Sequence, residues 1–240
     1  MNRLQERCVK AYSEHYTRMN PSIDPREQSA QSLKCMDRTY GEFTKSLAPN
    51  SKVLDLGCGT GFLLHWLASQ PNVVPVGVDA SPGQIEVAQS AIPEIETHCE
   101  DGLAFLQAHP ETFAGVFCSD VLEHIPEEDL LLEWVETVRA SLLPGGFFCI
   151  RVPNAANLFG CYSRYMDMTH ARMFTASSLL QLLEAGDFSH GRVFPIRAGW
   201  TVGQLRHLLE STAHRSLFWL TGRVGEDTFT SNVCAVGYRG

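Results

Sequence analysis

From residue 51 onward, short apolar segments alternate with amphipathic segments at the spacing of successive strand–helix–strand units. This alternation predicts a mainly parallel sheet, because neighbouring parallel strands need a helical crossover between them. The predicted strands are residues 53–56, 73–78, 96–99, 115–119, 147–152, 192–197 and 231–238. We therefore expect an α/β fold with a doubly wound, Rossmann-like, seven-stranded sheet and helices on both faces. A chain of 240 residues suits one such domain.

Helix signals fall between these strands. Ser81, Pro82 and Gln84 match a capping box with proline at the first helical position, so a helix is predicted to begin there. Thr175 and Gly186 mark the start and end of another helix. Further helices are predicted over residues 62–67, 102–108, 127–143 and 202–220, and the Pro-Gly-Gly run at 144–146 is expected to end the third of these.

The chain is predicted to have three parts. Residues 1–50 carry a helix-like stretch over 27–47 and no strand pattern, so we expect a helical cap or lid. Residues 51–240 form the α/β domain, and residues 201–222 are a helical insertion before its last strand. The leucines of the insertion are expected to pack into the core, with a lid or a homodimer surface as the alternatives.

Composition excludes several classes of protein. The chain has 19 basic and 27 acidic side chains and a net charge of −8, without a basic cluster, so nucleic-acid binding is not expected. Its eight cysteines are dispersed, which favours reduced thiols over disulfides or a zinc site. Residues 1–20 lack a signal-peptide core, and no segment approaches the roughly 18 apolar residues that span a bilayer. We expect a cytoplasmic protein without a transmembrane segment.

A glycine-rich loop follows the first predicted strand. Residues 55–61 read Asp-Leu-Gly-Cys-Gly-Thr-Gly and open a helix, so the glycines allow the backbone to approach a ligand closely. A tight turn without a ligand is the plain alternative. Asp55 precedes this loop, and Asp79 and Asp101 follow the next two strands. Because the carboxyl ends of parallel strands meet at one edge of a sheet, the three carboxylates are expected to line one ligand site.

The charge of these residues favours one kind of ligand. Asp55 would repel a pyrophosphate and would attract an ammonium or a positively charged sulfur. S-adenosylmethionine carries both cations, so it is favoured over NAD or FAD. Asp79 is placed to accept hydrogen bonds from two ribose hydroxyls, and Asp101 is placed to accept one from an adenine amino group.

Four motifs resemble the ordered motifs of class I S-adenosylmethionine-dependent methyltransferases: residues 53–61, 78–79, 100–102 and 119–125. The resemblance covers roughly residues 50–155. It implies that the glycine loop borders the methionine part, Asp79 holds the ribose, Asp101 contacts the adenine and Asp120 borders the methionine amino group. The predicted cofactor-binding residues are Asp55, Gly57, Cys58, Gly59, Gly61, Asp79, Ala80, Asp101, Gly102, Ser119 and Asp120.

Methylation of a hydroxyl needs a base near the transferred methyl group. His124 follows the fourth strand and is predicted either as that base or as a residue that only packs against the cofactor loop. His170 lies in a polar, aromatic segment after the fifth strand and is the preferred base, with Asp167 orienting it or the acceptor. Tyr16, Tyr162, Arg164 and Tyr165 are predicted to bind the acceptor.

The segment from Asp167 to Thr175 resembles bacterial methyltransferases that modify sugars or polysaccharide ends. This implies O-methylation of a polar, sugar-containing small molecule or glycan. O- or N-methylation of a natural product or quinone-like molecule is one alternative, with an aromatic cap from Tyr12, Tyr16, Phe218 and Trp219. A non-catalytic partner subunit of the same fold is the other. A metal site formed by Glu123, His124, Asp167 and His170 is an alternative, because a divalent ion can acidify a hydroxyl. No ligand spacing requires it and a His–Asp pair suffices for acid–base chemistry, so no metal is expected.

Overall fold

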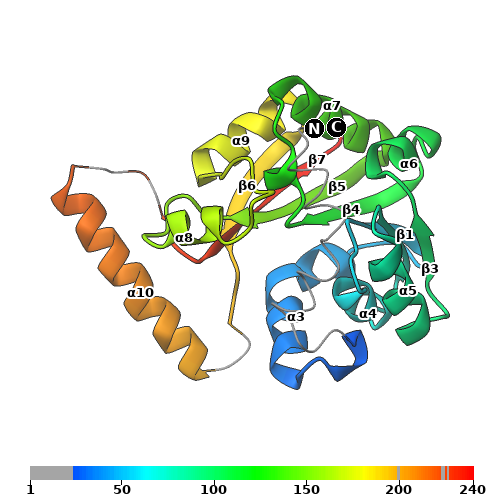
Figure 1. Ribbon diagram of the computed structural model, residues 1–240, viewed down its shortest axis with the longest axis horizontal. Coiled ribbons are helices and arrows are strands. Elements are labelled where there is room, and N and C mark those ends of the chain that lie inside the picture. Colours follow the sequence, from blue (N-terminus) through cyan, green and yellow to red (C-terminus); the bar gives the residue numbers. More distant parts are fainter. Residues whose placement is uncertain (1–23, 199–200, 223–224, 226) are drawn as a thin grey trace.

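The computed structural model describes residues 24–198, 201–222, 225 and 227–240. Its centre is a seven-stranded sheet with the strand order β3-β2-β1-β4-β5-β7-β6 (Figure 1). β1 to β5 pair in parallel, and β7 lies antiparallel between β5 and β6. The predicted doubly wound α/β fold is therefore confirmed.

The strands are β1 (Ser51–Leu56), β2 (Val73–Asp79), β3 (Glu96–Cys99), β4 (Phe113–Ser119), β5 (Leu142–Pro153), β6 (Ser189–Pro195) and β7 (Asn232–Tyr238). The helices are η1 (Pro25–Glu27), α3 (Ala30–Lys45), α4 (Phe62–Ala68), α5 (Pro82–Ala91), α6 (Gly102–Ala108), η2 (Leu122–His124), α7 (Glu128–Ser141), α8 (Gly160–Tyr165), α9 (Ala176–Ala185) and α10 (Thr201–Leu220). None of the described helices has the length and apolar character that a membrane span needs.

Two local expectations need correction. α5 begins at Pro82 as predicted, but the Ser81 side chain makes no capping hydrogen bond to it. The Pro-Gly-Gly run does not separate α7 from the fifth strand, because β5 already begins at Leu142. There Gly145 takes a φ of 76°, which allows the strand to bend and continue.

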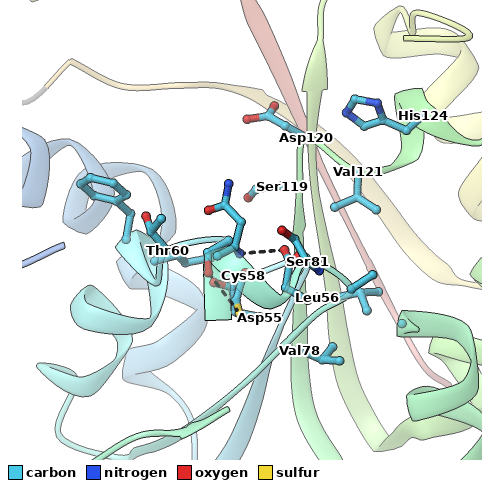
Figure 2. A pocket seen from close by; sticks show the side chains of 18 of the residues that line it. Asp55, Leu56, Cys58, Thr60, Val78, Ser81, Ser119, Asp120, Val121 and His124 are labelled. Atoms are coloured by element: carbon cyan, nitrogen blue, oxygen red, sulfur yellow. Dashed lines mark hydrogen bonds between the residues drawn. The ribbon is translucent and has the colours of Figure 1, made fainter. Parts of the chain in front are cut away.

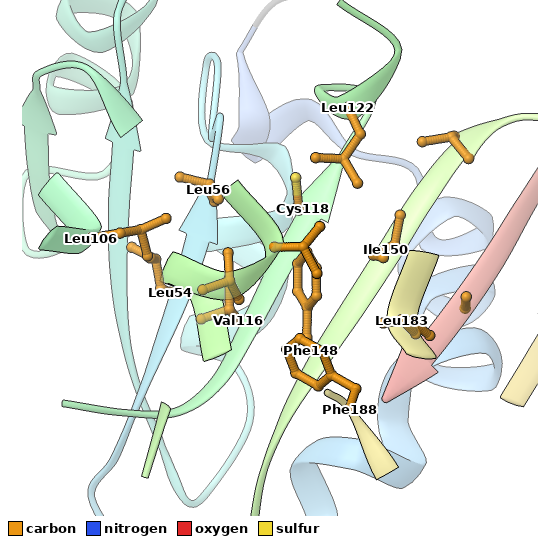
Figure 3. Packing of buried hydrophobic residues seen from close by; sticks show 14 of the residues in the cluster. Leu54, Leu56, Leu106, Val116, Cys118, Leu122, Phe148, Ile150, Leu183 and Phe188 are labelled. Atoms are coloured by element: carbon orange, nitrogen blue, oxygen red, sulfur yellow. The ribbon is translucent and has the colours of Figure 1, made fainter. Parts of the chain in front are cut away.

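One face of the sheet packs against α6, α7 and α9. Inward-facing side chains of the central strands, such as Leu54, Val116 and Phe148, meet Leu106, Val135 and Leu183 from these helices (Figure 3). The alternation of side chains along a strand sends every second residue to this face. Figure 3 shows the side chains of Phe148 and Phe188 next to each other, and their ring centroids lie 5.6 Å apart.

The opposite face is covered by α3 and α4. Tyr40 and Phe43 of α3 and Trp66 of α4 pack against Phe117 and Phe147 of the sheet. α3, which belongs to the predicted cap, therefore packs directly on one face of the sheet. Residues 1–23 of the predicted cap lie outside the described residues, and a lid role for this region stays a prediction.

The expectation that the leucines of α10 pack into the core is wrong. Their exposed fractions are 56% for Leu205, 63% for Leu209 and 69% for Leu220. The buried side of α10 is instead formed by His214, whose ring stacks on Phe229. Figure 1 shows α10 beside the sheet rather than within its helical layers.

Replacement of Phe148 by alanine should destabilise the domain by about 3 to 5 kcal/mol, because the side chain is fully buried and its removal leaves a cavity. Urea unfolding followed by circular dichroism measures this change. Val74→Ala serves as the control, because Val74 is 38% exposed and its truncation should change stability by less than about 0.5 kcal/mol. Equal effects of the two substitutions would contradict the described core.

Candidate functional site

A cavity of about 710 Å³ opens where the carboxyl ends of β1, β2 and β4 meet α3. Figure 2 shows Asp55, Cys58, Ser119, Asp120 and His124 around it. Predicted cofactor-binding residues that line the cavity are Asp55, Gly57, Cys58, Gly59, Asp79, Ala80, Asp101, Gly102, Ser119 and Asp120. Gly61 is not among its lining residues; it sits at the start of α4 with a φ of 91°.

The loop after β1 requires glycine for steric reasons. A Cβ atom at Gly57 would lie 2.3 Å from Cγ2 of Val121, and the φ of Gly57 is +77°. The backbone N–H groups of Gly57 and Cys58 both donate to the carbonyl oxygen of Val78, at 2.8 and 3.0 Å. These bonds hold the loop against the end of β2, so its backbone forms one wall of the cavity.

Asp79 joins the loops that follow β1 and β2. Its Oδ2 accepts from the Gly59 N–H at 2.9 Å, and its Oδ1 accepts from the Ser81 N–H at 2.8 Å. Burial raises the pKa of Asp79, while these two backbone hydrogen bonds oppose the rise. Each carboxylate oxygen retains acceptor capacity, as a residue that holds two ribose hydroxyls requires.

Asp55 lies deeper in the same cavity. Only 2% of the residue is exposed, and burial followed by the charge of Asp79 raises its pKa to about 7. The carboxyl group is therefore half-ionised near neutral pH. A cationic ligand nearby would favour the ionised form and would draw the pKa back down.

The lining residues fit an adenosine-containing cation. The Oγ1 of Thr60 and the Oε1 of Gln84 are buried without a hydrogen-bond partner among the described residues, although both residues line the cavity. Such atoms carry a desolvation penalty until a polar ligand or water reaches them. Asp101 lines the cavity and caps α6 by accepting from the Ala104 N–H at 3.0 Å.

The predicted base His124 lines the cavity, and Thr169 links it to Asp167. Thr169 Oγ1 lies 2.8 Å from His124 Nδ1 and donates to Asp167 Oδ1 at 2.7 Å. Burial opposes ionisation of Asp167, but the hydrogen bonds from Thr169 outweigh it and lower the Asp167 pKa. For His124, burial and then the charge of His170 lower the pKa. Asp167 therefore orients His124 through Thr169, and no direct bond between the two residues is described.

His170 lies behind His124 and is not among the residues that line the cavity. The two imidazole rings lie 4.8 Å apart, at an angle of 62°. His170 Nδ1 donates to the Ser163 carbonyl oxygen at 2.8 Å. The structure thus brings both candidate bases together, with His124 nearer to the cofactor residues.

Glu123 completes this cluster. It is fully buried, both of its carboxyl oxygens lack a hydrogen-bond partner among the described residues, and burial raises its pKa well above the usual range. Among the described residues, ligand atoms of Glu123, His124 and His170 lie within 4.8 Å of one another, so this is the group that could hold a metal ion.

The predicted acceptor residues are not brought into the cavity. Tyr162 and Tyr165 are 69% and 74% exposed on α8. Arg164 donates to the Ala171 carbonyl oxygen at 3.2 Å and lies over the Tyr165 ring. Tyr16 and Tyr12 lie outside the described residues, and Trp219 of the alternative aromatic cap is 72% exposed. None of the described residues in these two predictions lines the cavity.

Sequence reasoning missed Arg151, and it included Thr169 in the polar segment after the fifth strand without giving it a role; both residues line the cavity. Arg151 pairs with Asp120, whose other oxygen accepts from Asn232 Nδ2 at 3.0 Å. A signal for Arg151 was available, because it is the one charged residue in the apolar strand Phe-Phe-Cys-Ile-Arg-Val. Thr169 carried no comparable signal.

Comparisons with known proteins identify the family of this chain. The family model described as "Methyltransferase domain" matches residues 29–190. The ubiquinone biosynthesis O-methyltransferase of Aliivibrio fischeri MJ11 is 29% identical over 145 residues, which are 59% of this chain and 56% of the relative. Its counterpart in Coxiella burnetii Dugway is 33% identical over 98 residues, covering 39% of this chain and 40% of the relative. The chain thus spans about half the length of the curated relatives it matches.

Solved structures share the fold. A SAM-dependent methyltransferase from Archaeoglobus fulgidus superposes with a TM-score of 0.68 at 18% identity, covering 95% of this chain and 99% of that one. A possible histamine N-methyltransferase from Thermotoga maritima gives a TM-score of 0.63 at 14% identity, covering 98% of this chain and all of that one. The family model covers more than half of the chain, and the fold agrees with it. This chain therefore belongs to the methyltransferase-domain family, within the class I S-adenosylmethionine-dependent methyltransferases that the motifs predict.

Proposed function

We propose that this protein is a cytoplasmic enzyme that methylates a hydroxyl oxygen of a polar, sugar-containing small molecule or glycan. The observation that carries the proposal is the chain of contacts from Asp167 through Thr169 to His124 at the edge of the cofactor cavity. S-adenosylmethionine, the cofactor of this family, supplies a methyl group on a positively charged sulfur. The dispersed cysteines, all free among the described residues, support the cytoplasmic location.

The contacts of Thr169 fix the protonation of the His124 ring. The single hydroxyl hydrogen of Thr169 is donated to Asp167, so Thr169 Oγ1 can only accept from His124. His124 Nδ1 therefore carries the hydrogen, and Nε2 carries the lone pair. The lowered pKa of His124 keeps the ring neutral near neutral pH. His124 Nε2 is thus prepared to take the proton of an acceptor hydroxyl as its oxygen bonds to the methyl carbon.

The sequence favoured His170 over His124 as the base, and the geometry instead favours His124. His124 lines the cavity, whereas His170 lies behind it and is tied to the Ser163 carbonyl oxygen. In this arrangement His170 contributes mainly through its ring contact with His124. We therefore assign the base to His124 and a supporting role to His170.

The resemblance over residues 167–175 supports a sugar-containing acceptor, and the polar cluster beside the cavity suits one. A quinone-like acceptor is the second candidate, because Met36, Phe62, Leu63 and Trp134 also line the cavity and the matching relatives are named for ubiquinone biosynthesis. Incubation with labelled S-adenosylmethionine and panels of glycans, sugars and phenols, with mass detection of the methylated product, decides between them. A product from neither panel would favour the non-catalytic alternative. The predicted homodimer also stays a prediction, to be checked by light scattering.

Replacement of His124 by alanine should lower kcat by about 10²- to 10⁴-fold, because a positioned base is lost. His170→Ala should lower kcat less. Thr169→Val should change the pH profile of kcat, because the hydrogen bond to His124 Nδ1 that fixes the tautomer of the ring is lost. Steady-state kinetics over pH 5.5 to 9 with the identified acceptor measures these effects. A full loss in His170→Ala with normal activity in His124→Ala would reverse the assignment.

Asp79→Ala should weaken binding of S-adenosylhomocysteine by about 1.5 to 3 kcal/mol, the scale of hydrogen bonds to a charged group. Isothermal titration calorimetry measures the dissociation constant. Glu86→Ala on α5 is the control, because Glu86 is exposed and outside the cavity. An unchanged dissociation constant in Asp79→Ala would place the ribose elsewhere.

Affinity for the cofactor should rise with pH toward a plateau above pH 7. The pKa of Asp55 in the free protein is about 7, raised from 3.8, and the bound cation favours the ionised form. The same shift means that the carboxyl group stabilises the free protein below pH 4, and this contribution is lost as pH rises toward 7. Calorimetric titrations with S-adenosylmethionine, which carries the positively charged sulfur, from pH 5.5 to 8.5 test the first effect. Asp55→Asn should remove this pH dependence, and an equally steep dependence in that variant would assign it to another group.

A further inference from the structure

Arg151 stands out among the residues that line the cavity. It lies near the carboxyl end of β5, opposite Ser119 of β4 in the strand register. About one third of its side chain, 31%, is accessible, and the residue lines the cavity. No other arginine or lysine of the described residues lines this cavity, which also has four aspartates: Asp55, Asp79, Asp101 and Asp120.

Asp120 binds one side of the Arg151 guanidinium group, and Nε–H of this group has no hydrogen-bond partner among the described residues. Its Nη2 donates to Asp120 Oδ2, and Asp120 is fixed in turn by Asn232. The Asp120 N–H also donates to the Arg151 carbonyl oxygen at 2.8 Å, so the two backbones are tied together. Arg151 Nε is buried and has no hydrogen-bond partner among the described residues. A buried donor of a charged group that stays unsatisfied is costly.

The surroundings of Arg151 strengthen its attraction for an anion. Tyr40 of α3 is only 4% exposed and lies with Cys234 on the same face of the sheet. The Tyr40 hydroxyl is engaged with Cys234 Sγ at 3.8 Å. Arg151 Nε is itself buried, so this part of the guanidinium is shielded from water, and charge–charge attraction is stronger in such a setting.

We propose that Arg151 binds a carboxylate through the N–H groups of its guanidinium group that Asp120 does not occupy. Asp120 neutralises part of the Arg151 charge, and the other aspartates of the cavity are acidic, so a monoanion is favoured over a dianionic phosphate. Arginine presents pairs of parallel N–H groups that match the two oxygens of a carboxylate. This inference rests on the cofactor assignment and does not depend on which histidine is the base.

Two sources could supply that carboxylate: the amino-acid part of the cofactor, or the acceptor. The charges of the cavity favour the cofactor. S-adenosylmethionine has two cationic groups and one carboxylate, and the cavity has four aspartates and one arginine. Asp120 beside Arg151 would then face the ammonium group while Arg151 holds the carboxylate, so the ion pair would match a zwitterion.

The test compares two ligands that differ in the amino-acid part. S-adenosylhomocysteine has the carboxylate, whereas 5′-methylthioadenosine keeps the adenosine and sulfur without it. Calorimetry with Arg151→Met should show about a 10- to 100-fold weaker affinity for S-adenosylhomocysteine and an unchanged affinity for 5′-methylthioadenosine. Arg151→Lys keeps the ion pair with Asp120 and lacks the Nε–H, so it should lose part of this affinity and serves if the methionine variant unfolds. Arg192→Met is the matched control, because Arg192 pairs with Glu42 outside the cavity.

A second experiment tests whether the acceptor supplies the carboxylate. With S-adenosylhomocysteine bound, wild type is titrated with glucuronate and with glucose, which lacks the carboxylate, and with the corresponding phenols 3,4-dihydroxybenzoate and catechol. A preference for the carboxylate member of either pair that disappears in Arg151→Met, with normal cofactor affinity, assigns the carboxylate to the acceptor. Arg151 variants that bind S-adenosylhomocysteine normally, with no such preference to lose, overturn the proposal. Failure of wild type to bind either nucleoside would instead count against the cofactor site as a whole.

Discussion

The site depends on the carboxylate of Asp79, which accepts one backbone N–H from the loop after β1 and one from the loop after β2. These two bonds hold the loop after β1 and the loop after β2 against each other. The glycine loop packs closely against Val121 and is hydrogen-bonded to the end of β2. Asp55 of the central strand β1 is buried at the same edge, and that burial, followed by the charge of Asp79, raises its pKa. Geometry and electrostatics at this edge thus have the same origin.

Much of this arrangement could be predicted, because it follows from local sequence patterns. β3 and α6 have the predicted bounds. Asp55 and Asp79 reach the cavity from the carboxyl ends of β1 and β2, and Asp101 and Asp120 reach it from just beyond β3 and β4. Parallel strands place their carboxyl ends at one edge whatever the side chains elsewhere do. A motif at a strand end therefore carries spatial information that a motif in an irregular segment does not.

The remaining features depend on contacts between distant segments. Thr169 reaches His124 across 45 positions of sequence, and nothing near either residue indicates that contact. Tyr162 and Tyr165 looked suited to a pocket by composition, but α8 turns them outward. The leucines of α10 have helical spacing, yet periodicity reports only that a helix has an apolar side and does not say what covers that side. That Arg151 has a charged or polar partner could have been predicted, since a charge within an apolar strand needs one.

The attachment of α10 has a consequence for the cooperativity of folding. Its described contacts with the rest of the chain are few, centred on His214 with Leu158 and Phe229 and on the Arg215–Asp227 ion pair, while most of its apolar side chains are exposed. A helix held by so few buried contacts opens at a lower free energy than the sheet. Its amide hydrogens should exchange with solvent by local opening, while those of β1, β4 and β5 exchange only when the whole domain unfolds. α10 is thus a separate unit of the native-state ensemble, and changes in it can leave the cofactor edge intact.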